Sequence, residues 1–257
     1  MGVVNVTPDS FSDGGLYLDP ALAIEHGRQL EREGAAILDV GGESTRPGAE
    51  EVAPEEELRR VEPVVAALSG GEAVISVDTS KCAVAEAALD AGAEIVNDVT
   101  ALRGDPEMAA LCADRGATVV LMHMLGTPRT MQDEPHYDDV VDDVKAFLAG
   151  RLEAAVEAGV GEERIWLDPG IGFGKTAVHN LELLRRLAEL RELGRPLVVG
   201  TSRKSFIGKL DGSDAGDRLG GTIASSLLAA IEGAEVLRVH DVAAVGQAIA
   251  VADAILG

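Results

Sequence analysis

The sequence contains few aromatic residues and few cysteines, and each shortage narrows the class of protein. Aromatic residues make up 3% of the 257 positions, so the large core that this length allows must be built mainly from aliphatic side chains. The two cysteines, Cys82 and Cys112, lie in predicted helices and lack the spacing of metal ligands. We therefore expect reduced thiols that serve packing, in a cytoplasmic protein.

Basic residues are also scarce. There are 22 Lys and Arg against 44 Asp and Glu, which gives a formal net charge of −22. Nucleic acid and anionic membrane surfaces would be repelled at long range, so neither is expected as a partner. No apolar run reaches the length of a transmembrane helix, and no basic segment precedes the first apolar run. Acidic stretches such as 55–57 and 138–143 are interpreted as solvated helix faces.

Short apolar runs that end abruptly in polar residues predict eight strands. They cover residues 1–5, 36–39, 73–78, 94–97, 118–123, 165–168, 197–200 and 235–240. Between them, apolar residues recur near a spacing of 3.6, which predicts helices. Many of these helices are followed by a glycine of the kind that ends a helix: Gly34, Gly92, Gly116, Gly159, Gly194 and Gly233.

The regular alternation of strand and helix predicts an α/β protein with a closed (β/α)8 barrel, the TIM barrel. The strands read as nearly continuous apolar runs, which is typical of parallel strands buried on both faces. Long loops are expected after the strands, at 7–19, 41–54, 124–137 and 201–217. In such a barrel these loops form the catalytic face. We expect one domain over residues 1–257.

The segment R-I-W-L-D-P-G-I-G-F-G-K, residues 164–175, has the features of a ligand-binding loop. Asp168 ends an apolar run, and Pro169 and the following glycines prevent the strand from continuing. Glycine lets the backbone approach a flat ligand, while Phe173 and Lys175 would supply an aromatic face and a cation. The alternative is an ordinary strand and turn in which Asp168 caps a helix.

Polar residues lie at or just after the predicted strand ends. They are Asn5, Asp39, Asp78, Asn97, His123, Asp168, Lys204, Arg238 and His240. In a parallel barrel these ends meet at one mouth, so the side chains would converge. A helix cap at Asp78 or a core histidine at His123 would explain single members, but not the whole set.

The polar set divides into two chemical groups. Asp78, Asn97 and Asp168 offer acceptors and an amide that suit a planar heterocycle with adjacent N–H donors, such as a pterin or guanine. A second group offers cations and donors that suit phosphate: Arg46, Lys204, Arg238 and His240. A heterocycle joined to phosphate would satisfy both groups.

Seven motifs, in order along the whole chain, resemble those of the dihydropteroate synthase family. They are N-V-T-P-D-S-F-S-D-G-G at 5–15, G-E-S-T-R-P-G-A at 42–49, V-D-T at 77–79, N-D at 97–98, D-P-G-I-G-F-G-K at 168–175, S-R-K-S-F-I-G at 202–208 and R-V-H-D at 238–241. The first two are too long for chance to be a good explanation. The resemblance implies a transferase of folate biosynthesis that joins 6-hydroxymethyl-7,8-dihydropterin diphosphate to 4-aminobenzoate and releases pyrophosphate.

The same resemblance implies the site residues. The pterin-binding residues would be Asp78, Asn97, Met122, Asp168, Lys204 and Arg238. The diphosphate-binding residues would be Asn5, Thr45, Arg46, Arg238 and His240, with Asn5 as the protein ligand of Mg²⁺. The 4-aminobenzoate subsite, which sulfonamides occupy in the family, would comprise Thr45, Pro47, Phe173, Ser202 and Ser205. The catalytic residues would be Asp168, Lys204, Arg238 and His240.

The resemblance also implies a homodimer, for which the apolar segments 222–231 and 242–255 offer a candidate face. For the reaction itself, an arylamine is neutral at pH 7 and a weak nucleophile, so the main barrier is the departure of diphosphate. We therefore expect a dissociative, SN1-like path in which cations stabilise the leaving group and carboxylates stabilise the pterin cation.

Two other functions fit part of the pattern. A methyltetrahydrofolate methyltransferase would share the pterin contacts of Asp78, Asn97 and Asp168, but it has no need of the S-T-R-P segment or of the cation group at 202–205. The second is a related protein that binds the pterin without turning it over. Pyrophosphate release and product formation separate both from a dihydropteroate synthase.

Overall fold

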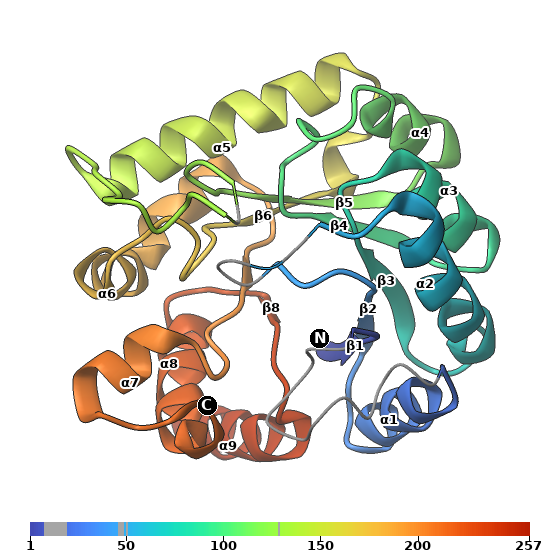
Figure 1. The fold of residues 1–257 in the computed structure, drawn as a ribbon. Helices are drawn as coiled ribbons and strands as arrows, with labels where there is room; N and C mark the ends of the chain where they lie inside the picture. The colour runs from blue at the N-terminus through green and yellow to red at the C-terminus, as the bar shows by residue number, and fades with distance from the viewer. Residues whose placement is uncertain (8–19, 46–48, 50, 128) are drawn as a thin grey trace.

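The structure is a computed structural model that describes residues 1–7, 20–45, 49, 51–127 and 129–257 (Figure 1). Its strands are β1 (Gly2–Asn5), β2 (Ile37–Gly41), β3 (Val74–Asp78), β4 (Ile95–Asp98), β5 (Thr118–Met122), β6 (Ile165–Asp168), β7 (Val198–Val199) and β8 (Val236–Leu237). Its α-helices are α1 (Pro20–Arg32), α2 (Pro54–Leu68), α3 (Cys82–Asp90), α4 (Met108–Arg115), α5 (Val140–Glu157), α6 (Ala177–Arg185), α7 (Ser205–Asp211), α8 (Leu219–Ile231) and α9 (Val242–Leu256). Short 3-10 helices are η2 (Glu162–Arg164), η3 (Leu187–Leu193) and η4 (Ala215–Asp217).

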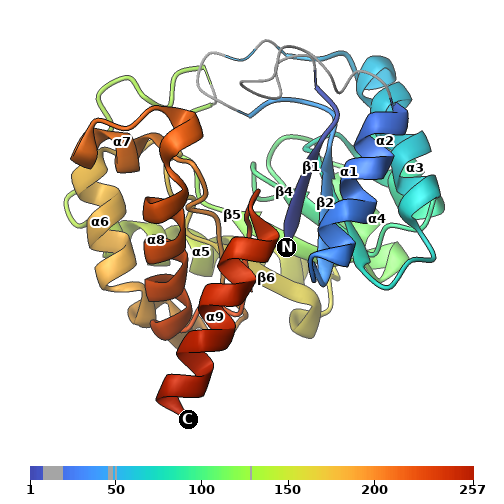
Figure 2. The ribbon, with the colours of Figure 1, turned by 90° about the horizontal axis from the view of Figure 1, so that it is seen from below.

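The strands form a continuous ring. Strands β1 to β6 pair in parallel in sequence order, and β7 pairs with β8. Single parallel bridges connect these two sheets on both sides, Leu167 with Leu197 and Gly2 with Val239. Across the second joint, Val3 N donates to Val239 O at 3.0 Å. The helices lie outside the ring in both views (Figures 1 and 2). The expected (β/α)8 barrel is confirmed.

Aliphatic side chains fill both sides of the ring. The largest cluster of buried residues lies between strands and helices and includes Val4, Val40 and Leu167, each with no exposed surface. A smaller cluster joins Ile95 of β4, Val120 of β5 and a residue of β7, and so fills the interior of the barrel. Burial on both faces explains why the strands are apolar throughout rather than alternating.

The helix ends follow the predicted glycines. All six have positive φ: Gly34, Gly92, Gly116, Gly159, Gly194 and Gly233. One loop prediction was wrong in part, because residues 201–217 contain α7 and η4. Phe206 and Ile207 are 3% and 4% exposed, so α7 forms by burying an apolar pair against the barrel.

The interpretation of 55–57 as a solvated helix face is wrong for Glu57. This residue is 1% exposed and lies on the buried face of α2. Val61 and Val65 follow it at helical spacing, and both are buried. Glu57 is therefore a buried carboxylate within an acidic stretch.

The two thiols are free, and Cys112 is buried in the core. Burial raises the pKa of Cys112 to about 12, so its thiol stays protonated and takes part in packing. Within the described ranges, the helices are too short or too polar for any of them to cross a bilayer.

The loop after β6 folds back closely on the end of β5. His123 N donates to Asp168 O at 2.9 Å, which brings the two strand ends together. Gly170 has φ +67, and a Cβ at this position would lie 1.9 Å from His123 O. Glycine is required here on both counts, since the backbone is left-handed and the space is already filled.

We expect Gly170→Ala to lower the free energy of unfolding by at least about 2 kcal/mol, because it adds both backbone strain and a clash with a carbonyl. Gly150→Ala is the matched control. Gly150 lies within α5 with open space around it, so alanine there should stabilise by about 0.5–1 kcal/mol. Urea unfolding of the three proteins measures both changes, and equal effects at the two positions would contradict the assignment.

Candidate active site

A buried network joins the carboxyl ends of four strands. Asp39 of β2 has no exposed surface and accepts hydrogen bonds from Ser76 Oγ at 2.6 Å, Asn97 Nδ2 at 3.0 Å and Arg238 Nε at 2.6 Å. Arg238, which follows β8, also donates from Nη2 to Asp78 Oδ2 at 2.8 Å. The network fixes the amide of Asn97 and the guanidinium of Arg238 at the barrel mouth.

One of the two carboxylate oxygens of Asp78 is unpaired within the described part of the chain. Its Oδ1 is buried and has no hydrogen-bond partner among the described residues. Burial raises the pKa of Asp78 to about 7, against the opposing effect of Arg238. Asp78 does not cap α3, whose N-cap is Lys81, so the cap alternative is wrong. An unpaired buried acceptor at a strand end is available to an N–H donor of a ligand.

Asp168 lies at the end of β6 and is 7% exposed. Its Oδ1 accepts a hydrogen bond from Gly170 N at 2.6 Å. The side chain of Thr176, not Asp168, caps α6, so the cap alternative fails here too. Burial raises the pKa of Asp168, and the positive charge of Lys204 opposes that rise.

Lys204 lies directly before α7 and faces the loop after β6, which begins at Asp168. Its Nζ donates to Ile171 O and lies 4.8 Å from the centre of the Phe173 ring. Burial lowers the pKa of Lys204 to about 8, while Asp168 favours its charged form. Phe173 also packs against a buried apolar cluster that contains Met122, so an aromatic and apolar surface adjoins the cation.

Lys175 does not face a ligand, so that prediction was wrong. It is 2% exposed, and its Nζ donates to Gly170 O and Phe173 O at 3.0 Å each. The same Nζ lies 2.8 Å from His123 Nδ1. Burial lowers the pKa of His123 to about 3, with Lys175 adding to the effect. His123 is therefore a neutral core histidine, as the alternative reading held.

The segments after β7 and β8 are tied to each other. Ser202 Oγ lies 2.9 Å from His240 Nδ1 and accepts from His240 N at 3.2 Å. Arg203 binds Asp241 through two hydrogen bonds, of 3.0 and 2.6 Å. Ser202 is thus held beside a predicted diphosphate residue. Ser205 is the exposed first residue of α7.

Two further predicted residues, Asn5 and Thr45, come from β1 and from the segment after β2. Asn5 ends β1 in register with Gly41 and is half-buried. Thr45 lines a pocket of about 320 Å³ together with Asp78. Arg46 and Pro47 lie outside the described residues.

Comparison with known proteins matches this arrangement to one family. A family model described as pterin binding enzyme matches residues 1–240. The dihydropteroate synthase of Escherichia coli (strain K12) is 48% identical over 257 residues, which covers 100% of this chain and 91% of the relative. The chain belongs to the dihydropteroate synthase family. The family expected from the motifs is confirmed.

Solved dihydropteroate synthases share the fold closely. The enzyme of Xanthomonas albilineans, solved with 4-aminobenzoic acid, is 50% identical, with a TM-score of 0.94 and coverage of 100% of this chain and 92% of that one. The enzyme of Yersinia pestis, in a sulfonamide drug complex, is 44% identical, with a TM-score of 0.96 and coverage of 100% and 93%.

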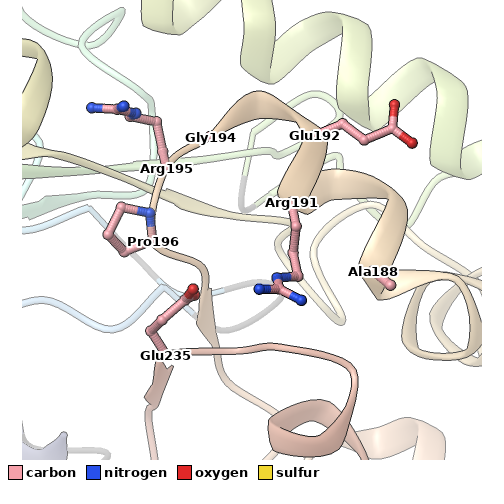
Figure 3. A pocket seen from close by; sticks show the side chains of 7 residues that line it. All are labelled: Ala188, Arg191, Glu192, Gly194, Arg195, Pro196 and Glu235. Atoms are coloured by element: carbon pink, nitrogen blue, oxygen red, sulfur yellow. The ribbon is translucent and has the colours of Figure 1, made fainter.

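A second pocket, of about 550 Å³, lies at the opposite end of this dihydropteroate synthase fold (Figure 3). Its lining comes from η3 and from residues that precede β7 and β8: Ala188, Arg191, Glu192, Gly194, Arg195, Pro196 and Glu235. Figure 3 shows Arg191 and Glu235 directed into the same space, whereas Arg195 points away from it. None of the predicted site residues that the structure describes lines this pocket.

A second charged group, which was not predicted from the sequence, lies beside the barrel mouth. Lys81 Nζ donates to the carboxylates of Glu43 and Glu57. The missed signal was the helical spacing of Glu57 with Val61 and Val65, which places Glu57 on the buried face of α2. A carboxylate on such a face requires a partner.

We expect the pH dependence of stability to report the buried state of Asp78. Its pKa in the folded protein, about 7, is raised above the ordinary value of 3.8, so the folded state holds the proton more tightly. The resulting stability is complete below about pH 4 and is lost as the pH rises to 7. In Asp78→Asn this loss should disappear from urea unfolding curves recorded between pH 4.5 and 8. Parallel curves for the two proteins would contradict the assignment.

Proposed function

We propose that this enzyme condenses 6-hydroxymethyl-7,8-dihydropterin diphosphate with 4-aminobenzoate to give 7,8-dihydropteroate and pyrophosphate in folate biosynthesis. The observation that carries the proposal is the unpaired, buried Oδ1 of Asp78 beside the guanidinium of Arg238. An acceptor that would suit a heterocycle therefore lies beside a cation that would suit phosphate. We also propose that residues 1–257 form a single pterin-binding domain.

The pterin would lie among the strand-end residues of the barrel. Asp78 and Asp168 accept hydrogen bonds from its N–H groups, and Asn97 adds an amide that Asp39 orients. Met122, Lys204 and Arg238 would contact the ring as well. Because Asp39 and Gly170 already hold these groups, the ligand meets side chains that are arranged before it arrives.

The second half of the mouth would bind the diphosphate and the arylamine. The diphosphate-binding residues are proposed to be Asn5, Thr45, Arg46, Arg238 and His240. The 4-aminobenzoate subsite is proposed to comprise Thr45, Pro47, Phe173, Ser202 and Ser205. The relatives solved with 4-aminobenzoic acid and with a sulfonamide drug support this assignment and make the chain a candidate sulfonamide target.

The reaction breaks the bond between the pterin methylene carbon and the diphosphate oxygen, then forms a carbon–nitrogen bond and releases the amine proton. The amine is a weak nucleophile, so departure of diphosphate is the main barrier. Lys204, Arg238 and His240 would stabilise negative charge on the leaving oxygen. Asp168 would stabilise the positive charge left on the pterin. We propose a dissociative, SN1-like path on this basis.

Mg²⁺ is the proposed cofactor, and the residues present fit it. Asn5 offers a hard amide oxygen at the end of β1, and Mg²⁺ is commonly held by one or two protein oxygens together with phosphate and water. Asp39 is less suited, since it has no exposed surface and its oxygens already accept three hydrogen bonds. When bound beside Asn5, the ion would supply positive charge to the diphosphate. Cys82, Asp105 and Glu107 also lie close enough together to hold a metal ion, but none of them is among the predicted site residues.

A homodimer is proposed through the outer surfaces of α8 and α9. Their exposed large apolar residues are Leu219, Leu228, Ile231, Val251, Ile255 and Leu256. Such a concentration of apolar side chains is typical of an interface between subunits. The free thiols support the cytoplasm as the location of the enzyme.

We expect purified protein to form 7,8-dihydropteroate and pyrophosphate when both substrates and Mg²⁺ are supplied, with product detected by mass spectrometry. Asp168→Asn and Lys204→Ala should each lower kcat/KM by roughly a thousandfold, because each removes a charge that acts on the reacting groups. Lys145→Met, on the outer helix α5, is the control and should keep wild-type activity.

Three results would count against this function. Activity near wild type in Asp168→Asn would overturn the pterin assignment. Transfer of a methyl group without pyrophosphate release would indicate the methyltransferase. Binding of the pterin diphosphate without product would indicate a protein that no longer turns over.

We expect the wild type to sediment as a dimer and Leu228→Asp with Ile231→Asp to sediment as a monomer. These residues are 58% and 54% exposed and lie one turn apart on α8, so two charges there would prevent apolar contact. Val178→Asp is the matched control, since Val178 is 73% exposed on α6. A dimer that persists in the double variant during sedimentation velocity would place the interface elsewhere.

A further inference from the structure

Lys81 connects two carboxylates from different elements beside the candidate active site. Its Nζ donates to Oε2 of Glu43, in the segment after β2, and to Oε2 of Glu57 on α2. The side chains of Lys81, Glu43 and Glu57 are 15%, 25% and 1% exposed. Burial alone lowers the pKa of Lys81, but both carboxylates bind its charged form and the net shift is upward. We name this arrangement the Lys81 clasp.

The segment after β2 also lies directly on α2. A Cβ at Gly42 would lie 2.7 Å from Val61 Cγ2 and 3.0 Å from Glu57 Cγ. Arg60 Nη1 donates to Gly42 O at 2.9 Å. The backbone at Gly42 and the side chain of Glu43 are therefore both anchored to the same helix, one through Arg60 and the other through Lys81.

The other end of the clasp is fixed to β3. Lys81 lies three positions after Asp78 and is the N-cap residue of α3. Its backbone N donates to Thr79 Oγ1 at 3.2 Å, which holds the turn between the strand and the helix. The clasp thus links the loop after β2 to the loop after β3.

Both linked loops carry proposed substrate contacts. Thr45 lies two positions after Glu43, and Asp78 precedes the turn that holds Lys81. Thr45, Asp78, Glu43, Glu57 and Lys81 line the same pocket of about 320 Å³. The distance between the Thr45 side and the Asp78 side of this pocket therefore depends on the clasp.

We propose that Lys81 is a positioning residue, whose ion pairs with Glu43 and Glu57 hold the segment carrying Thr45 where 4-aminobenzoate and diphosphate can bind. The inference rests on the proposed function and adds to it a specific cause of affinity for two ligands. Asp78 ends β3 and is held by Arg238, and Asp168 and Lys204 belong to other elements, so the pterin itself should be bound without help from the segment after β2.

The decisive variant is Glu43→Ala, which removes the contact between Glu43 and Lys81 and leaves the Lys81–Glu57 pair and the Arg60–Gly42 hydrogen bond intact. We expect a rise of about tenfold in the KM for 4-aminobenzoate and in the Kd for pyrophosphate. The Kd for 6-hydroxymethyl-7,8-dihydropterin, which lacks the diphosphate, should stay at the wild-type value. Glu43→Gln can still accept a hydrogen bond from Lys81 and should show a smaller rise. Steady-state kinetics and calorimetric titration measure these constants.

Lys81→Met tests the same clasp from its centre. It should reproduce the two increases and also lower the Tm, because Glu57 loses its partner while buried. Lys145→Met is the matched control, since Lys145 forms an ion pair of 2.6 Å with Glu192 on the outer surface, and it should change none of the constants.

The possible results distinguish failure of the clasp proposal from failure of the proposed function on which it rests. If the wild type forms no dihydropteroate, the proposed function fails and the clasp fails with it. If the wild type is active and Glu43→Ala keeps wild-type constants, the clasp alone is overturned. If Glu43→Ala weakens the pterin as much as 4-aminobenzoate, Lys81 serves general stability, and the positioning role is overturned.

Discussion

The buried contact between Asp39 and Arg238 is the interaction on which the candidate site depends. A carboxylate without exposed surface must be hydrogen-bonded, and Asp39 meets this need with groups from β3, β4 and the end of β8. In doing so it orients Asn97 and places Arg238 against Asp78. The requirement to satisfy one buried charge therefore arranges several side chains that a ligand can use.

The repeating pattern of the fold could be predicted from the sequence because it arises from local rules. Apolar runs ending in polar residues gave the strands, and glycines marked the helix ends. The burial of polar side chains could not be predicted in the same way. Glu57 was interpreted as part of a solvated helix face and Lys175 as a cation for a ligand, and only the packing of elements distant along the chain encloses them.

The candidate site could be predicted as a set of residues, but not as a set of contacts. Asp78, Asp168 and Lys204 were identified because they lie near strand ends, and a barrel brings such positions together. Their pairing depends on side-chain geometry that no spacing encodes. Ser202 illustrates this, since its hydroxyl is engaged with His240, on a different strand's loop. The net charge of −22 likewise does not indicate that cations lie at the mouth.

The burial of Lys175 has a consequence for molecules designed against this protein. Its amine donates hydrogen bonds to the carbonyls of Gly170 and Phe173, so the loop after β6 is held in place without a ligand. The loop therefore has its shape before a ligand binds. An inhibitor that matches the existing shape would spend little free energy on reshaping the protein.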